Sequence, residues 1–99
     1  MRTVAIVCGA GVATSALIAA RVREHLAGRT EKVAVRQATV MDLLSPQFTA
    51  DVVVSTVEIP PALGIPVVSG MPLLLQTRPE LALEELDRQL ALLDQADAS

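Results

Sequence analysis

A single cysteine, Cys8, precedes a short glycine-containing segment whose residue types suit the binding of a phosphoryl group. Gly9 and Gly11 allow the backbone to curl so that successive N–H groups point at one spot. A helix that starts directly afterwards would add unpaired N–H donors and the positive end of its dipole. Either Thr14 or Ser15 would cap that helix and supply a hydroxyl donor. The predicted site therefore has Cys8 as its catalytic residue and a phosphoryl-binding loop made of Gly9, Ala10, Gly11, Val12, Ala13, Thr14 and Ser15.

The place of Cys8 at the mouth of this loop predicts its chemistry. Backbone N–H groups and a helix dipole favour the thiolate, which is the nucleophilic form of cysteine. If the thiolate attacks a phosphoryl group, the resulting S-phosphate dianion stays among the same N–H groups. A cysteine inside a strand would be interpreted as a small buried hydrophobe. Cys8 instead follows a strand and precedes two spaced glycines and a helix start, which favours a reactive role.

Two kinds of nucleotide-binding loop fit this segment less well. In a dinucleotide-binding loop Thr14 would have to be the third glycine, and the second strand would have to end in an acid where Gln37 and Ala38 stand. A nucleoside-triphosphate loop needs a lysine before the hydroxyl residues, and this segment has none. The second kind is excluded, and the first is the weaker interpretation.

A cysteine-dependent phosphatase is the closer alternative, because it uses the same order of strand, loop and helix. The chemistry resembles that of the low-molecular-weight tyrosine phosphatases, which place an arginine six positions after the cysteine to grip the phosphate. Here that position is Thr14, and no later loop has an aspartate-proline pair to protonate a leaving group. Without the cation and the acid, hydrolysis loses its main transition-state support. The loop is therefore predicted to hold a phosphocysteine without hastening its hydrolysis, as a carrier would.

The elements that must position Cys8 follow from the pattern of apolar residues. Two runs rich in β-branched residues, 4–7 and 51–54, predict strands buried on both faces. From Thr14 the apolar residues recur every four positions, which predicts an amphipathic helix with Gly28 as its left-handed C-terminal cap. Its apolar stripe contains Ile18, Val22 and Leu26, with Ser15 and Ala19 beside them. His25 lies at the edge of this stripe and is interpreted as a boundary residue rather than a catalytic one.

Three shorter segments complete a predicted sheet. Residues 32–39 alternate as a half-exposed edge strand does, and residues 65–68 form a last short strand. Residues 40–45 form a short helix that is stopped by Pro46. The order of the elements predicts a small parallel α/β sheet that is covered on both faces, in a single domain of residues 1–99.

The last helix has its own start signal and its own apolar face. Residues 77–80 have the form of a capping box with Pro79 inside the first turn. The face consists of Leu83, Leu86, Leu90 and Leu93. Leu81 and Leu92 fall on the opposite side, which hints at a partner surface.

The composition excludes several other classes of function. With 99 residues, of which 52% are hydrophobic and 19% charged, the chain is long enough for one core and too apolar for disorder. Phe48 is the one aromatic residue and the formal net charge is -3, so nucleic-acid binding is not expected. No apolar run reaches the roughly 18 residues that a membrane span needs, so direct membrane insertion is not expected. The start lacks a signal-peptide layout and one cysteine forms no internal disulfide, which predicts a cytoplasmic protein.

The chain resembles the IIB component of the bacterial sugar phosphotransferase system, and within it the galactitol-type branch. The likeness rests first on the loop from Cys8 to Ser15, where a Cys-Gly-x-Gly-Val-Ala-Thr-Ser sequence is characteristic. Further segments support it in the same order along the chain: Val53-Val54-Ser55-Thr56, Gly64-Ile65-Pro66-Val67 and Gly70-Met71-Pro72-Leu73.

The resemblance implies a flavodoxin-like α/β fold, with four parallel strands in the order 2-1-3-4 and helices on both faces. It implies that Cys8 takes a phosphoryl group from a phosphohistidine on a IIA protein. Cys8 would then pass it to a sugar or a galactitol-like sugar alcohol held by the membrane IIC transporter, which would also supply the general base. No metal and no cofactor are expected.

Two functions of other classes remain open. The same loop would serve a regulatory module that senses phosphorylation, or a weak phosphatase of the low-molecular-weight type.

Leu17 and the tips around residues 9–13 are expected to form part of a docking face, because both partners must reach Cys8. Arg21 and Arg36 are interpreted as solvated surface charges rather than contacts for an acidic partner.

Overall fold

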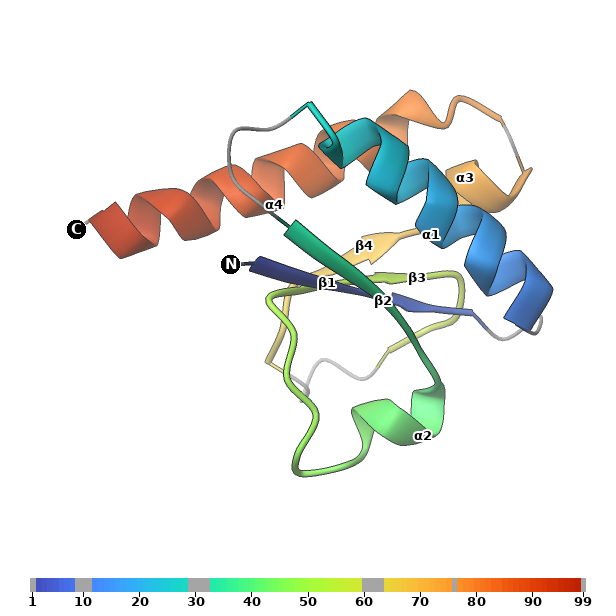
Figure 1. The fold of residues 1–99 in the computed structure, drawn as a ribbon, viewed down its shortest axis with the longest axis horizontal. Coiled ribbons are helices and arrows are strands. Elements are labelled where there is room, and N and C mark those ends of the chain that lie inside the picture. The colour runs from blue at the N-terminus through green and yellow to red at the C-terminus, as the bar shows by residue number, and fades with distance from the viewer. Residues whose placement is uncertain (1, 9–11, 29–32, 60–63, 76, 99) are drawn as a thin grey trace.

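A four-stranded parallel sheet lies at the centre of the computed structural model, which describes residues 2–8, 12–28, 33–59, 64–75 and 77–98 (Figure 1). The strands are β1 (Arg2–Val7), β2 (Val33–Ala38), β3 (Val52–Ser55) and β4 (Val67–Ser69). They lie in the order β2-β1-β3-β4, and every neighbouring pair is parallel. The predicted fold class and strand order are confirmed.

Helices cover both faces of this sheet. They are α1 (Val12–Leu26), α2 (Val40–Leu43), α3 (Met71–Leu75) and α4 (Glu80–Ala98). Figure 1 shows α1, α3 and α4 on one side of the strands and the short α2 on the other. The two faces are therefore covered unequally, by two long helices on one side and by a single helical turn and loops on the other.

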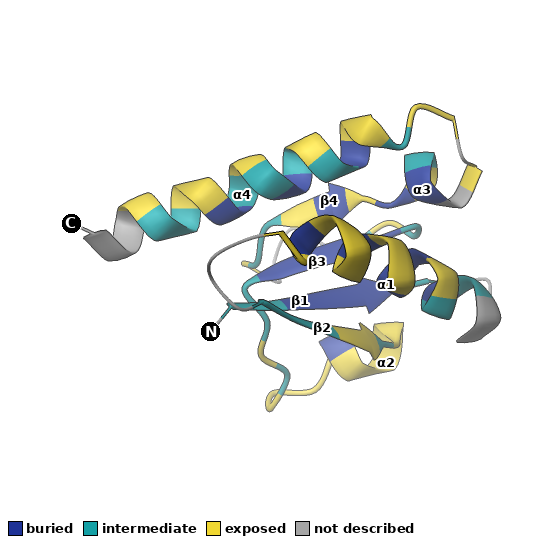
Figure 2. Cartoon of the chain, turned by 45° about the horizontal axis from the view of Figure 1, so that its top comes forward, coloured by how far each residue is buried: buried dark blue, intermediate teal, exposed yellow. Residues whose placement is uncertain are grey.

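The continuous apolar run of β1 is explained by burial on both of its faces. Val4 and Ile6 belong to the larger core cluster, which contains side chains of α1, α3 and α4. Ala5 and Val7 belong to a smaller cluster that includes Leu43 of α2. Successive side chains of a strand point to opposite faces, so a central strand between two layers must be apolar throughout. Figure 2 shows this buried centre and the exposed outer surfaces of the helices.

The predicted stripe of α1 is confirmed, whereas the predicted cap is wrong. The stripe is buried along its length and contains Ser15, Ile18, Ala19, Val22 and Leu26. The helix begins at Val12, two residues before Thr14, and ends at Leu26. Gly28 does not have a positive φ, and Ala27 continues the turn with a hydrogen bond from its N–H to the carbonyl of Glu24 at 3.4 Å. The helix thus ends in a tightened last turn rather than in a left-handed glycine.

The edge strand and the short helix after it occur where they are predicted. β2 is the outer neighbour of β1, and α2 follows within two residues. Thr39 caps α2: its hydroxyl accepts the N–H of Asp42 at 3.1 Å, and the Asp42 carboxylate accepts the N–H of Thr39 at 2.9 Å. A helix of one turn has N–H groups without partners inside it, and this capping box provides acceptors for such groups.

The predicted capping box of the last helix is wrong, because the backbone turns sharply before the helix. Arg78 has a φ of 52°, and Thr77 donates its hydroxyl to the carbonyl of Leu75 at 3.4 Å. α4 therefore begins at Glu80, after Pro79. Its apolar face is confirmed: Leu86 and Leu90 are buried, Leu83 and Leu93 pack against the same cluster, and Leu81 and Leu92 are exposed.

The last part of the sheet differs from the prediction in two ways. β4 begins at Val67, two residues later than predicted, because Pro66 has no N–H and contributes only its carbonyl, which accepts the N–H of Val53 at 2.9 Å. The short helix α3 was not predicted. Its Leu73 is buried in the larger cluster, so this single turn closes the core between β4 and α4.

Candidate active site

The two central strands end side by side, at the point where the strand order reverses. From β1 the chain passes to β2 on one side of the sheet, whereas β3 leads to β4 on the other. Val7 and Ser55 are the last paired residues of β1 and β3. In open parallel sheets this position, outside the carboxyl ends of the strands, is where ligands bind. The residues that come next on the two strands, Cys8 and Thr56, therefore lie at the expected place for a site.

Cys8 and Thr56 contact each other directly. The hydroxyl of Thr56 donates to Sγ of Cys8, with 3.2 Å between Oγ1 and the sulfur. Cys8 is a free thiol that is partly buried and packs against the larger core cluster. Its side chain is thus anchored on one side without being sealed in the interior.

Backbone hydrogen bonds hold Thr56 in register with the end of β1. Its N–H donates to the carbonyl of Val7 at 3.1 Å, and the carbonyl of Ser55 accepts the N–H of Gly70 at 2.8 Å. The buried hydroxyl of Ser55 donates to the carbonyl of Val57 at 2.7 Å and accepts the N–H of the same residue at 3.0 Å. This side-chain turn directs the chain away from the sheet immediately after Thr56.

The structure describes only part of the predicted phosphoryl-binding loop. Gly9, Ala10 and Gly11 lie outside the described residues. Val12 and Ala13 are the first two residues of α1.

The two hydroxyl residues of the loop do not cap α1. Because the helix begins at Val12, both Thr14 and Ser15 lie within its first turn, so the predicted capping role is wrong. Thr14 is half-buried and Ser15 is only 5% exposed. This first turn has no acidic residue of its own to compensate the positive end of the helix dipole. Three residues along the chain, Gly9 to Gly11, separate Cys8 from the start of this helix.

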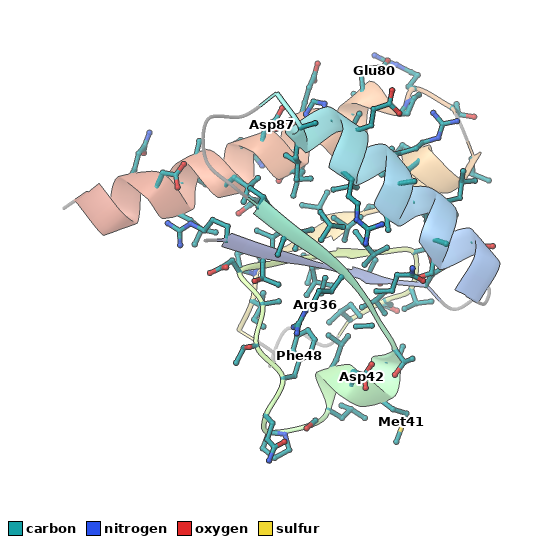
Figure 3. The ribbon with its side chains drawn as sticks, viewed as in Figure 1. Arg36, Met41, Asp42, Phe48, Glu80 and Asp87 are labelled. Atoms are coloured by element: carbon teal, nitrogen blue, oxygen red, sulfur yellow. The ribbon has the colours of Figure 1, made fainter. Side chains whose placement is uncertain are left out.

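Two other polar residues that the sequence analysis considered, His25 and Arg36, make contacts away from Cys8. His25 lies at the end of α1, with 2.8 Å between its Nε2 and the Oδ2 of Asp87 on α4, and Figure 3 shows Asp87 beside that end of α1. Arg36 donates to the carbonyl of Thr49 at 2.8 Å. Arg21 is exposed, as predicted. These contacts join helices and loops of the scaffold.

Two cavities lie apart from the Cys8–Thr56 pair. One of about 240 Å³ is on the α2 side of the sheet, and its lining includes Arg36, Asp42 and Phe48, which Figure 3 places below the strands. The other, of about 430 Å³, lies between α1 and the start of α4, and its lining includes Arg21 and His25. Neither lining includes Cys8.

The acidic helix α4 carries a local charge pair. The guanidinium of Arg88 donates to Glu85 at 2.7 Å, and Gln89 donates to the same carboxylate at 3.0 Å. The hydrogen bond from Arg88 is the main reason why the pKa of Glu85 lies below its ordinary value, and the pKa of Arg88 is raised in return. This pair is exposed on α4, and within the described ranges neither residue contacts Cys8 or Thr56.

Two further searches give negative results for the described part of the chain. Within it, no three histidine, cysteine, aspartate or glutamate side chains gather in a way that could hold a metal ion. None of the helices in the described ranges has the length and apolar character that crossing a membrane requires.

Sequence reasoning missed Thr56 as a member of the site. The signal was present, since a hydroxyl residue directly follows the apolar run of the second central strand. This signal becomes informative only once the register of β1 against β3 is known. The register pairs Val7 with Ser55, so the residues that follow them, Cys8 and Thr56, come together.

Comparison with known proteins identifies the family. No curated protein matches the chain. The family model described as the lactose/cellobiose-specific IIB subunit of the phosphotransferase system matches residues 3–85. This span contains Cys8, Thr56 and all of the four strands except Arg2, the first residue of β1. Its description names lactose and cellobiose rather than galactitol, and it supports the resemblance at the level of the IIB component. The chain therefore belongs to the IIB family of the sugar phosphotransferase system, a family of phosphoryl carriers in sugar transport.

Proposed function

We propose that the chain is a phosphocysteine carrier that moves a phosphoryl group from a IIA protein to a sugar held by a membrane IIC transporter, with residues 1–99 acting as one IIB domain. The observation that carries the proposal is the position of Cys8. Its partly exposed thiol lies at the switch point of the sheet, four residues before the start of α1. Family membership supplies the reaction class, and this position supplies the acceptor atom.

In the first transfer, the sulfur of Cys8 attacks the phosphorus of a phosphohistidine on the IIA protein. The S–P bond forms as the P–N bond breaks. The imidazole nitrogen leaves with the electron pair of that bond, and the proton released by the thiol balances its charge. The residues between Cys8 and α1, Gly9 to Gly11, and the first turn of α1 are proposed to bind the phosphoryl oxygens through backbone N–H groups.

In the second transfer, a hydroxyl oxygen of the acceptor attacks the same phosphorus. The O–P bond forms, the S–P bond breaks, and the sulfur leaves as a thiolate. The proton of the attacking hydroxyl goes to a base on the IIC protein. Both transfers exchange one phosphoester-like bond for another, so positioning and charge stabilisation account for most of the catalysis.

The residue at position 14 supports a carrier more than a phosphatase. Position 14, six residues after the cysteine, is a threonine that lies within α1. A tyrosine phosphatase of low molecular weight resembles this site in layout and has an arginine there. Without that cation the phosphocysteine is held but its attack by water is not promoted.

The proposal also covers the sugar that accepts the phosphoryl group and the location of the protein in the cell. The sequence of the loop resembles the galactitol branch, which favours a galactitol-like sugar alcohol, whereas the family description names lactose and cellobiose. The sugar itself is recognised by the IIC protein, so the acceptor is decided by that partner. Such a carrier works at the inner surface of the membrane, which makes a cytoplasmic location part of the same proposal.

The test is phosphoryl transfer in a reconstituted system. The protein is incubated with the general phosphotransferase proteins, a matched IIA protein and labelled phosphoenolpyruvate, and we expect one labelled phosphate on Cys8. Cys8→Ser is expected to take no label. A Cys8→Ser protein that labels normally would overturn the proposal, and sustained release of phosphate from an aryl phosphate by the wild type would favour the phosphatase instead.

A second measurement separates transport from sensing. The loaded protein is mixed with vesicles that contain the IIC protein and with galactitol, lactose or cellobiose in turn. Loss of label from Cys8 with appearance of a sugar phosphate supports the carrier and names its acceptor. Label that stays on Cys8 with every acceptor would favour a regulatory module.

A further inference from the structure

We infer that Thr56 is a positioning residue for phosphoryl transfer: its hydroxyl orients the sulfur of Cys8 and stabilises the charge on that sulfur. The inference rests on the proposed function, since it assigns a role within the same site. The observation behind it is the hydrogen bond from Oγ1 of Thr56 to Sγ of Cys8, at 3.2 Å, across the ends of two neighbouring strands.

The methyl group of Thr56 lies on the side of Gly70, while its hydroxyl donates to Cys8. A Cβ built on Gly70 would lie 3.4 Å from Cγ2 of Thr56 and 3.2 Å from Cγ1 of Val54, so this glycine is closely covered by the two side chains. The methyl and the hydroxyl of a threonine are attached to the same Cβ, and one torsion angle therefore sets both. With the methyl group facing the space beside Gly70, the hydroxyl lies on the side of the sulfur.

The backbone of Thr56 is held as firmly as its side chain. Its N–H is bonded to the carbonyl of Val7, one residue before Cys8. The preceding residue, Ser55, is 3% exposed and is bonded on both sides, to Gly70 and to Val57. The donor and the sulfur are thus carried by two strands that cannot shift independently, which is the condition for a preorganised interaction.

The hydroxyl donor acts differently in the empty and in the loaded state. In the empty state it donates to the sulfur, which orients the sulfur and limits the directions from which phosphorus is approached. Once the S–P bond has formed, negative charge moves to the phosphoryl oxygens, and rotation about the Cβ–Oγ1 bond allows the same proton to turn toward one of them. When the S–P bond breaks, the hydroxyl again stabilises the sulfur that leaves with the electron pair. Thr56 keeps its proton throughout and exchanges no atoms.

Two variants separate the donor from the shape of the side chain. Thr56→Val keeps the branched shape and the methyl contact with Gly70 and removes the donor. Thr56→Ser keeps the donor and removes the methyl. A merely structural role predicts that Thr56→Ser is the more harmful change, whereas positioning of the sulfur predicts that Thr56→Val is.

The first readout is the rate of Cys8 alkylation by iodoacetamide at neutral pH, which needs no partner protein. In Thr56→Val we expect this rate to fall about fivefold, because the hydrogen-bond donor that orients the sulfur is lost. Thr56→Ser should restore the wild-type rate. Thr49→Val makes the same exchange before the opposite end of β3 and should leave the rate unchanged.

The second readout is the rate of labelling from the phosphorylated IIA protein. Thr56→Val should lower this rate roughly tenfold at neutral pH, with Thr56→Ser within about twofold of the wild type. Thermal unfolding of each variant is measured alongside. If Thr56→Val does not fold, Thr56→Ala takes its place with the same expected results.

The outcomes distinguish this inference from the proposed function. An unchanged alkylation rate and an unchanged labelling rate in a folded Thr56→Val protein would overturn the role of Thr56 and leave the carrier intact. A wild-type protein that takes no label would overturn the carrier, whatever Thr56 does to alkylation.

Discussion

Thr3 and Asp51 exchange two hydrogen bonds at the beginning of the central strand pair. The N–H of Thr3 donates to Oδ2 of Asp51 at 2.7 Å, and the N–H of Asp51 donates to the carbonyl of Thr3 at 2.8 Å. The other carboxylate oxygen lies 3.7 Å from Nη1 of Arg2. One carboxylate therefore fastens β1 to the residue that precedes β3, at the opposite end of the sheet from Cys8.

Loss of the Asp51 carboxylate should destabilise the fold without altering the site chemistry. Asp51→Ala leaves the partly buried N–H of Thr3 without its charged acceptor, so we expect the free energy of unfolding to fall by about 1.5–3 kcal/mol. Asp51→Asn keeps an acceptor oxygen and should cost about 1 kcal/mol or less. Urea denaturation measures both variants. Equal losses would mean that the ion pair with Arg2, rather than the hydrogen bond, is what matters.

Two glycines should respond in opposite ways to replacement by alanine. At Gly70 an added methyl group would meet Cγ1 of the buried Val54 at 3.2 Å, so Gly70→Ala should cost about 1–3 kcal/mol in unfolding free energy.

Gly28 is the matched control. A Cβ built there has nothing within 4 Å, and its φ is not positive. Gly28→Ala should therefore be neutral or stabilise the fold by up to about 1 kcal/mol, by restricting the unfolded chain. A destabilised Gly28→Ala protein together with an unaffected Gly70→Ala protein would contradict this assignment of close packing.

Leu17 is expected to contact the IIA donor. It is 44% exposed on α1, at about 8 Å along the helix axis from the first residue, Val12. A charge there would have to be buried against the donor, so Leu17→Asp should lower kcat/KM of labelling about tenfold while leaving the unfolding free energy nearly unchanged.

Leu92→Asp serves as the control for Leu17→Asp, because any partner surface at Leu92 lies away from the end of α1 where the donor is expected to bind. Leu92 is similarly exposed, at 52%, but it lies in the C-terminal half of α4, which Figure 1 places far from the start of α1. Its labelling kinetics should match those of the wild type. Equal slowing in both variants would point to a general effect of added negative charge and remove Leu17 from the docking face.

The parts of the fold that the sequence predicts well are those with a long apolar pattern. The run at residues 4–7 and the stripe through Ile18 and Val22 each extend over enough positions to define their periodicity, and both are buried as expected. α3 has five residues and includes Pro72, so it has no period to recognise, and its helical state comes from the burial of Leu73 under α4.

The wrong predictions concern ends of helices, where a single backbone angle decides. Thr77 to Glu80 has the residue types of a capping box, but the φ of 52° at Arg78 turns the chain so that Thr77 bonds backward to Leu75. Nothing in the local sequence distinguishes this arrangement, since arginine seldom adopts a positive φ. The position of Gly28 likewise suggested a left-handed cap that the chain does not form.

The candidate site likewise combines one residue that the local sequence points to and one that it does not. Cys8 was predicted from local sequence, because a strand, a loop and a helix start follow one another directly. Its partner Thr56 is 48 positions away along the chain, and only the register between β1 and β3 brings them together.

The two outer strands of the sheet also bear on how the protein meets other chains. β4 has three residues, and β2 carries Arg36 and Gln37 in its exposed half. A brief edge offers few backbone groups for pairing, and a charged side chain on the other edge opposes the approach of a foreign strand. Both features disfavour aggregation by strand addition, which suits a shuttle that must separate from each partner before it can meet the next.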